Sequence, residues 1–305
     1  MRPKREKFAV SQASARGSLG FKSRIVEKEG SVLSLAKTEV ITIPPTMSIK
    51  GAAEMMAEHR FRRLPVTDPG TKRLLGIIGS SDLIDFLGGG KKARLLQVKH
   101  KGNFLAAVND SVREIMVTDV LTLEKEDDLQ ECLALMLKSR VGGIVIIDDD
   151  RLVVGVITER DFVRMLSGKS TSKKVEEYMT RKVVMASPDM SLGEATRALV
   201  RYSFRRLPVV TDGELVGMLT TRDIIKFIGD NKIFAKMRSG GLEGALGTPV
   251  SELMNKDVPT VNGETDLGEV ARIIEESGTG TVCIVGPGGL EGILTERDIM
   301  RALAD

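Results

Sequence analysis

The stretch "GVITERDFVRML" at residues 155–166 reads as a short strand that runs into a helix. Two close copies follow, "GMLTTRDIIKFI" at residues 217–228 and "GILTERDIMRAL" at residues 292–303. An altered copy, "GIIGSSDLIDFL", precedes it at residues 76–87. A lone Thr with an Asp three residues later would predict only a capped helix start, in which both side chains bond to backbone amides. Four copies in one chain predict a repeated structural unit.

Aligning the chain on this motif predicts a β-α-β-β-α unit and an α/β (α+β) fold. Each unit opens with a short strand, at residues 40–43, 120–123, 183–186 and 258–261. A helix with apolar residues at helical spacing follows, then a second strand, turn residues, a third strand and the motif helix. In three of the four units the first helix is predicted to begin with a capping box. These boxes are Asp128 with Glu131, Ser191 with Glu194, and Asp266 with Glu269, whereas the first unit has Ser48 followed by Gly51.

The odd and even units differ systematically, which indicates a duplicated pair. Units one and three carry "FRRLPV" at the second strand, and units two and four carry small residues there. The linkers after units one and three also resemble each other. We therefore predict two modules, units one and two and units three and four, with a boundary near residues 167–173.

Composition places the chain among ordinary globular proteins. Of its 305 residues, 42% are hydrophobic and 29% are charged, and no apolar run approaches the roughly 18 residues of a membrane span. The net charge of +3 is uneven, because residues 1–30 hold eight Lys or Arg against three Glu. Cys132 and Cys283 lie in predicted buried elements, which favours a role as small core residues in a reducing cytoplasm.

The unit, its "RRLPV" strand and its closing Gly-x-[Ile/Leu]-Thr-x-Arg-Asp helix resemble the CBS domain. That domain is named for cystathionine β-synthase and also occurs in IMP dehydrogenase and the γ subunit of AMP-activated protein kinase. The resemblance covers residues 33–305. With four such units, the chain resembles archaeal proteins built from two tandem CBS pairs. It predicts a tail at 1–32, repeats at 33–88, 111–167, 174–229 and 249–305, and linkers at 89–110 and 230–248.

The resemblance implies ligand clefts between paired repeats, each combining the Thr and Asp of one repeat with the second strand of its partner. Two clefts are predicted to be good nucleotide sites. The first sets Thr158, Arg160 and Asp161 against Phe61, Arg62 and Arg63; the second sets Thr295, Arg297 and Asp298 against Phe204, Arg205 and Arg206. Adenine is expected beside backbone at Thr42, Ile43 and Pro44 in the first, and at Met185 to Ser187 in the second.

The residue types suit an adenosine nucleotide. An ionised Asp accepts hydrogen bonds from ribose hydroxyls, and Thr at a helix N-terminus suits ribose or a phosphate. Paired arginines neutralise phosphate with planar forks. The other two clefts are predicted to be poorer. One holds Thr220, Arg222 and Asp223 opposite Gly280 and Thr281, without partner arginines; the other keeps Asp82 but has Gly79 and Ser81 in place of Thr and Arg.

We therefore expect a cytoplasmic, non-enzymatic regulatory protein that binds AMP, ADP or ATP and acts on a protein partner or as a homodimer. No catalytic or metal-ligating cluster is predicted, and His59 and His100 are isolated in sequence. One alternative ligand is S-adenosylmethionine, which the poorer Asp223 cleft would accept more readily. Another alternative is nucleic-acid binding through the basic tail and residues 91–102, against which the low aromatic content of 4% argues.

Overall fold

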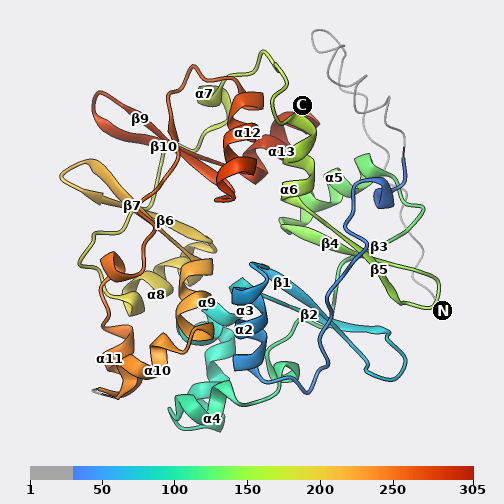
Figure 1. Ribbon diagram of the computed structural model, residues 1–305, viewed down its shortest axis with the longest axis vertical. Coiled ribbons are helices and arrows are strands. Elements are labelled where there is room, and N and C mark those ends of the chain that lie inside the picture. The colour runs from blue at the N-terminus through green and yellow to red at the C-terminus, as the bar shows by residue number, and fades with distance from the viewer. Residues whose placement is uncertain (1–29, 239) are drawn as a thin grey trace.

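A computed structural model describes residues 30–238 and 240–305 of the chain (Figure 1). The four predicted repeats are present, and their mixed helices and strands confirm the α+β class. Repeat one comprises α2 (Ile49–Glu58), β1 (Arg63–Thr67), β2 (Leu74–Gly79) and α3 (Ser80–Leu87). Repeat two comprises β3 (Thr122–Glu124), α5 (Leu129–Ser139), β4 (Gly143–Ile147), β5 (Val153–Thr158) and α6 (Glu159–Leu166).

The second half of the chain repeats this order. Repeat three comprises α8 (Leu192–Tyr202), β6 (Arg206–Thr211), β7 (Glu214–Thr220) and α9 (Thr221–Gly229). Repeat four comprises β8 (Thr260–Val261), α12 (Leu267–Ser277), β9 (Thr281–Gly286), β10 (Gly289–Thr295) and α13 (Glu296–Ala304). Short helices connect the repeats: η1 (Val32–Ser34), η2 (Lys91–Ala93), the π-helical η3 (Leu95–Lys99), α4 (Phe104–Val108), η4 (Val112–Glu114), α7 (Val175–Tyr178), α10 (Lys232–Met237), α11 (Gly241–Leu246) and η5 (Val250–Glu252).

The opening strands are complete in only half of the repeats. β3 and β8 each pair in parallel with the next strand, β4 and β9 respectively. In repeats one and three the prediction of a strand was wrong, because only the single bridges Ile43–Val66 and Ala186–Val209 form. A proline stands two residues after each bridge, where the next ladder N–H would donate, at Pro45 and Pro188. Since proline has no backbone N–H to donate, the ladder stops there.

Helix capping follows the sequence only in part. Ser191 and Glu194 form the predicted reciprocal box at the start of α8. Asp128 and Asp266 cap α5 and α12 with their side chains, but no reciprocal bond from Glu131 or Glu269 is formed. Glu269 instead pairs with Arg272 at 2.6 Å on the exposed face of its helix, so the predicted boxes at α5 and α12 were wrong.

The sheets of repeats one and two face each other, and so do those of repeats three and four. Leu74 of β2 is buried with Val145 and Ile147 of β4 in a small apolar cluster. Met218 of β7 is buried in the same way with Cys283 and Ile293. These two clusters confirm the predicted pairing into two tandem modules. Cys132 and Cys283 are both buried free thiols, and burial raises the pKa of each to about 12.

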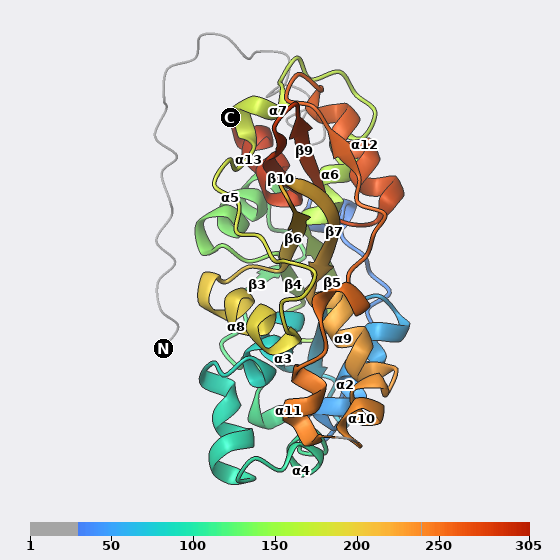
Figure 2. The same ribbon diagram turned by 90° about the vertical axis from the view of Figure 1, so that its left-hand side faces the viewer.

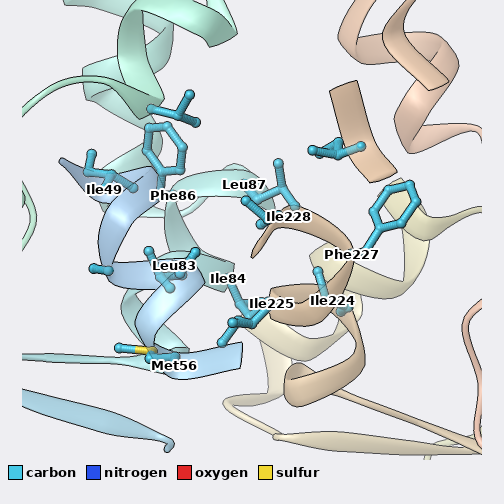
Figure 3. Packing of buried hydrophobic residues seen from close by; sticks show 14 of the residues in the cluster. Ile49, Met56, Leu83, Ile84, Phe86, Leu87, Ile224, Ile225, Phe227 and Ile228 are labelled. Atoms are coloured by element: carbon cyan, nitrogen blue, oxygen red, sulfur yellow. The ribbon is translucent and has the colours of Figure 1, made fainter. Parts of the chain in front are cut away.

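The two modules join through their helices into a flat ring (Figures 1 and 2). One large apolar core combines repeats one and three, and a second combines repeats two and four. Figure 3 shows the first of these cores, where Leu83 and Ile84 of α3 lie opposite Ile224 and Ile225 of α9. Every repeat therefore contacts one neighbour through its sheet and another through its helices. The strand ends that lead into the motif helices meet at the middle of the ring.

Candidate functional site

The motif threonines and aspartates form reciprocal caps at the starts of three helices. The Oδ2 atoms of Asp161, Asp223 and Asp298 each accept from the backbone N–H of the motif Thr at 2.8 Å. The hydroxyls of Thr158, Thr220 and Thr295 donate to the same oxygens at 2.6 to 2.7 Å. The helix ends thus fix the orientation of each carboxylate. An ionised carboxylate has several acceptor positions, so the caps leave it able to bind further donors.

A cavity of about 220 Å³ lies between repeats one and two at Asp161. It brings Phe61, Arg62 and Arg63 together with Thr158, Arg160 and Asp161, the combination that the sequence predicts for this cleft. The ring of His59 stacks on Phe61 with centroids 5.4 Å apart. The cleft therefore offers an aromatic wall, a fixed carboxylate and several cations.

The backbone that lines this cleft lies three residues before the stretch expected at the adenine edge. Ile43 is buried in the core, and its N–H and C=O are bonded to Pro65 and Thr67. The cavity is lined by Lys37 and Glu39–Ile41, and Thr42, Ile43 and Pro44 are not among its walls. The bridge to β1 occupies the polar groups of Ile43, so the adenine contact at Thr42, Ile43 and Pro44 stays a prediction that the cavity walls do not support.

The equivalent positions in repeat three are open to solvent. Met185, Tyr202 and Phe204 are 48%, 45% and 43% exposed, and Tyr202 stacks on Phe204 at 5.6 Å. Tyr202 and Phe204 stand where His59 and Phe61 stand in repeat one. Ser187 is also exposed, whereas Ala186 between them is buried and its backbone bonds to Pro208 and Val210. An aromatic surface is thus present beside the second predicted site.

The Asp223 cleft holds more arginines than the sequence predicts, although its partner repeat four supplies none of them. A cavity of about 80 Å³ there is lined by Thr220, Arg222 and Asp223 from repeat three and by Pro259, Thr279 and Thr281 from repeat four. Arg62, Arg205 and Arg206 line it as well. Arg62 arrives from the other module, because the helix-to-helix contact between repeats one and three brings their second strands together. Burial raises the pKa of Asp223 despite the opposing bonds from Thr220.

The aspartate of the altered first motif is paired with a lysine from the linker that follows. Asp82 pairs with the Lys92 ammonium from η2, which also donates to the carbonyl of Ile115. The backbone N–H of Lys92 donates to Asp85 at 2.6 Å. Because Gly79 replaces the motif Thr, Asp82 accepts only one bond from its own helix start, from the backbone N–H of Gly79 at 2.6 Å. The linker thus supplies this carboxylate with a cation from within the chain.

Two glutamates that sequence reasoning missed lie at the centre of the ring. Glu159 and Glu296 are the first residues of α6 and α13, and each is 0% exposed. Glu159 contacts Arg205 at 2.7 Å and Arg297 at 2.9 Å. Glu296 contacts Arg62 at 2.6 Å and Arg160 at 3.3 Å. The signal was available in the motif, since repeats two and four read Thr-Glu-Arg-Asp and the others carry a hydroxyl residue there.

The remaining arginine forks are held by backbone carbonyls. Arg63 donates to Gly142 O at 2.5 Å, and Arg206 donates to Gly280 O at 2.6 Å. Arg160 and Arg222 both reach Gly278 O, at 2.9 and 3.2 Å, and Arg297 reaches Arg140 O at 2.9 Å. The sequence predicts arginines whose guanidinium groups are free to bind phosphate. In the structure each of these arginines already bonds to a glutamate or to a backbone carbonyl. Arg160 and Arg297 also reach across to the opposite module, where they bond to Gly278 and Glu159 respectively, and Arg160 still lines the cleft of its own motif.

The centre is strongly cationic despite its two glutamates. Burial would raise the pKa of Glu296, but Arg62, Arg206 and Arg160 outweigh it and lower that pKa to about 2. The pKa of Glu159 is likewise lowered, because Arg205, Arg62 and Arg297 outweigh its burial. Burial and neighbouring arginines lower the pKa of Arg63 and of Arg206 to about 9, so both stay charged at neutral pH. Seven arginines therefore surround two ionised glutamates: Arg62, Arg63, Arg160, Arg205, Arg206, Arg222 and Arg297.

The rest of the described chain adds few other candidates. Within residues 30–238 and 240–305, no three His, Cys, Asp or Glu side chains gather as a metal site would require. His100 bonds to Asp110 at 2.7 Å. A helix of the length and apolarity needed to cross a membrane is absent from the same ranges.

Comparison with known proteins places the repeats in one family. The CBS domain model matches residues 32–89, 112–168, 175–230 and 250–305. Protein MJ1225 of Methanocaldococcus jannaschii is 38% identical over 276 residues, which are 90% of this chain and 99% of that protein. Its crystal structure, proposed to be that of an archaeal homologue of γ-AMPK, superposes with a TM-score of 0.84 at 37% identity, covering 89% of this chain and 99% of that one.

Two further relatives show how widely the repeats occur. A 33.4 kDa protein from a ribosomal RNA operon of Thermofilum pendens is 29% identical over 261 residues, 86% of this chain and 87% of that protein. Inosine-5′-monophosphate dehydrogenase of Methanocaldococcus jannaschii is 35% identical over 114 residues, 37% of this chain but only 22% of the enzyme. The likeness to the enzyme is thus limited to a small part of it. From the family match and the paired sheets, the chain belongs to the CBS-domain family and carries four CBS domains in two tandem pairs.

Proposed function

We propose that this protein is a non-catalytic cytoplasmic regulator that binds AMP, ADP or ATP between its paired CBS domains. The observation that carries the proposal is that six of the seven central arginines, all but Arg297, line the Asp161 and Asp223 cavities. A compact group of buried cations favours an anionic ligand, because phosphate oxygens accept from several arginine forks at once.

The Asp161 cleft supplies the remaining parts of a nucleotide site. Asp161 is oriented by Thr158 and offers acceptors for the ribose hydroxyls. Phe61 and His59 provide a flat apolar wall for a base. Arg62 and Arg160 lie on the same cavity and would meet the phosphates. The Asp298 motif and the exposed Phe204 are proposed to form a second site of the same kind.

S-adenosylmethionine fits less well than a nucleotide. Its adenosine would suit the same carboxylates, but its sulfonium is positive. The Asp223 cleft was the one expected to accept it, and that cleft is lined by Arg62, Arg205, Arg206 and Arg222. Like charges in a partly buried site repel, so these arginines disfavour the sulfonium there too.

Nucleic-acid binding is also less well supported. Within the basic stretch at residues 91–102, Lys92 pairs with Asp82, and Lys99 pairs with Asp110 at 2.9 Å and Glu114 at 3.3 Å. Two of its cations are thus already neutralised by the chain itself. The tail at residues 1–29 lies outside the described residues. Its removal should leave nucleotide binding intact.

Calorimetric titration with AMP, ADP, ATP and S-adenosylmethionine tests the proposal. We expect adenine nucleotides to bind and to raise the melting temperature, because a ligand that binds only the folded state stabilises it. Asp189→Ala, at an exposed position away from the clefts, is a matched control for substitutions at Asp161 and Asp223. Binding of S-adenosylmethionine without any binding of the three nucleotides would refute the proposal.

A further inference from the structure

We propose that Glu159 and Glu296 determine which nucleotide the protein prefers. They form salt bridges with the same arginines that would bind the phosphate groups of a nucleotide. They act as internal anions that compete with phosphate and so favour a monophosphate over a triphosphate. This inference rests on the proposed function and names residues that set its specificity.

The first step is that both glutamates form ion pairs with arginines from other repeats. Glu159, in repeat two, contacts Arg205 of repeat three and Arg297 of repeat four, and Arg62 of repeat one lies 4.0 Å away. Glu296, in repeat four, contacts Arg62 and Arg160 of repeats one and two. Both carboxylates are completely buried, so water screens these contacts little.

The second step is that the same arginines line the cavities. Arg62 and Arg222 are walls of both the Asp161 cavity and the Asp223 cavity. Arg160 also lines the first cavity, and Arg205 lines the second. A phosphate that enters either cavity therefore meets forks that a glutamate already holds. Because two cations are shared, the charge of a ligand in one cleft also changes the other.

The third step is that the fold does not require an acid at this position. The equivalent first residues of α3 and α9 are Ser80 and Thr221, both buried. Their hydroxyls approach each other at 3.5 Å across the contact between repeats one and three. Neutral residues thus start the same helix in the same fold, and the acids in repeats two and four serve the arginines.

The consequence is a charge-dependent preference. Each glutamate repels the negative charge of a bound ligand while it occupies donors that the ligand would use. ATP carries more negative charge than AMP and needs more donors, so the penalty grows along the phosphate chain. Neutralising a glutamate should therefore help ATP more than AMP.

Glu159→Gln and Glu296→Gln test this by calorimetric titration with AMP and ATP. We expect each change to raise the ratio of ATP affinity to AMP affinity by about tenfold, the effect of a charge removed at short range in a partly buried site. Exposed Glu243→Gln on α11 is the matched control and should leave the ratio unchanged. Glu159→Asp, which keeps the charge, should also leave it close to that of the unchanged protein.

A gain of charge gives the reverse test and covers the case in which a glutamine variant does not fold. Thr221→Glu places a third acid at the equivalent helix start, and we expect the ATP-to-AMP ratio to fall. Equal changes for both nucleotides, or an unchanged ratio in the glutamine and Thr221 variants, would overturn the inference. If the unchanged protein binds nucleotides and only the ratio fails to move, the proposed function stands. If the unchanged protein binds none, both fail.

Discussion

At the scale of single residues, the motif aspartates cap their helices and are the carboxylates that we propose to bind ligand. Each of Asp161, Asp223 and Asp298 is bonded to the N–H and the hydroxyl of its threonine. Asp82 instead pairs with Lys92. Asp161 and Asp223 line cavities whereas Asp82 faces a lysine, so these carboxylates should respond differently to removal.

Asp161→Ala should remove one nucleotide site and weaken its binding by roughly ten- to a hundredfold. The reason is the loss of a charge-assisted acceptor, which costs about 1.5–3 kcal/mol. Asp298→Ala is expected to do the same at its own site. Titration calorimetry reports the number of sites and the affinity together.

Asp82→Ala is the companion measurement and should leave every nucleotide site in place. It should lower the free energy of unfolding by about 1–2 kcal/mol, because Lys92 loses a partly buried ionic partner. If Asp82→Ala removed the tightest site while Asp161→Ala bound normally, the assignment of clefts would be mistaken. Asp223→Ala should now also weaken binding, since its cleft holds the arginines that the sequence did not place there.

Acid should destabilise the protein through its central glutamates. The pKa of Glu296 is lowered from 4.5 to about 2, and the pKa of Glu159 is lowered as well. A carboxyl whose pKa is lower in the folded state stabilises the fold above its unfolded pKa, and this contribution is lost as the pH falls through the folded value. Urea unfolding should therefore show a loss of stability between pH 4.5 and about 2, smaller in Glu296→Gln. An identical acid profile in that variant would count against these contacts.

At the scale of elements, close packing of the helices joins the two modules. A Cβ at Gly229, at the end of α9, would lie 2.9 Å from Ala57 Cβ and 3.0 Å from the carbonyl oxygen of Ala53 on α2. Gly88, at the end of α3, would meet the backbone of α8 at Thr196 in the same way, at 2.9 Å. Glycine at both positions lets the helices approach.

Gly229→Ala should lower the free energy of unfolding by about 1–3 kcal/mol, because the added methyl overlaps a neighbouring helix that cannot move freely. Gly288→Ala is the control, since a Cβ there meets nothing within 4 Å. Chemical denaturation of the two variants gives the comparison. Equal stabilities would mean that the helices adjust without cost.

The elements also show where sequence reasoning succeeds and fails. Periodicity and the Thr-x-x-Asp signal place the helices well, because those signals depend on local backbone chemistry. The strands before Pro45 and Pro188 shrink to single bridges, and the boxes at Asp128 and Asp266 lack their second half. The central glutamates were missed because their partners come from repeats far away in sequence, such as Arg62 for Glu296.

At the scale of the whole molecule, arginines are shared between modules. The sequence suggests clefts within each pair, but it does not show how the pairs meet, so it did not predict cations from the other module at the Asp223 cleft. The ring supplies them from repeat one through Arg62. A residue of one repeat can therefore line cavities in both modules.

Arg62→Lys should weaken nucleotide binding at both the Asp161 and the Asp223 clefts by about tenfold, since lysine keeps the charge but loses the planar fork. Arg60→Lys is the matched control, because Arg60 is a wall of the Asp161 cavity and not of the Asp223 cavity. Its effect should be confined to one site. Loss at a single site in Arg62→Lys would argue against the sharing of this arginine.

Lys92 makes the first repeat different from the other three. Because it is tethered to the same chain as Asp82, its effective concentration at that carboxylate does not vary with the composition of the cell. One corner of an otherwise pseudo-symmetric assembly is therefore marked by a lysine from the linker, whereas Asp161 and Asp298 pair with arginines of their own helices. The four corners are therefore not equivalent, and two pairs of similar sequence build an assembly with a defined orientation.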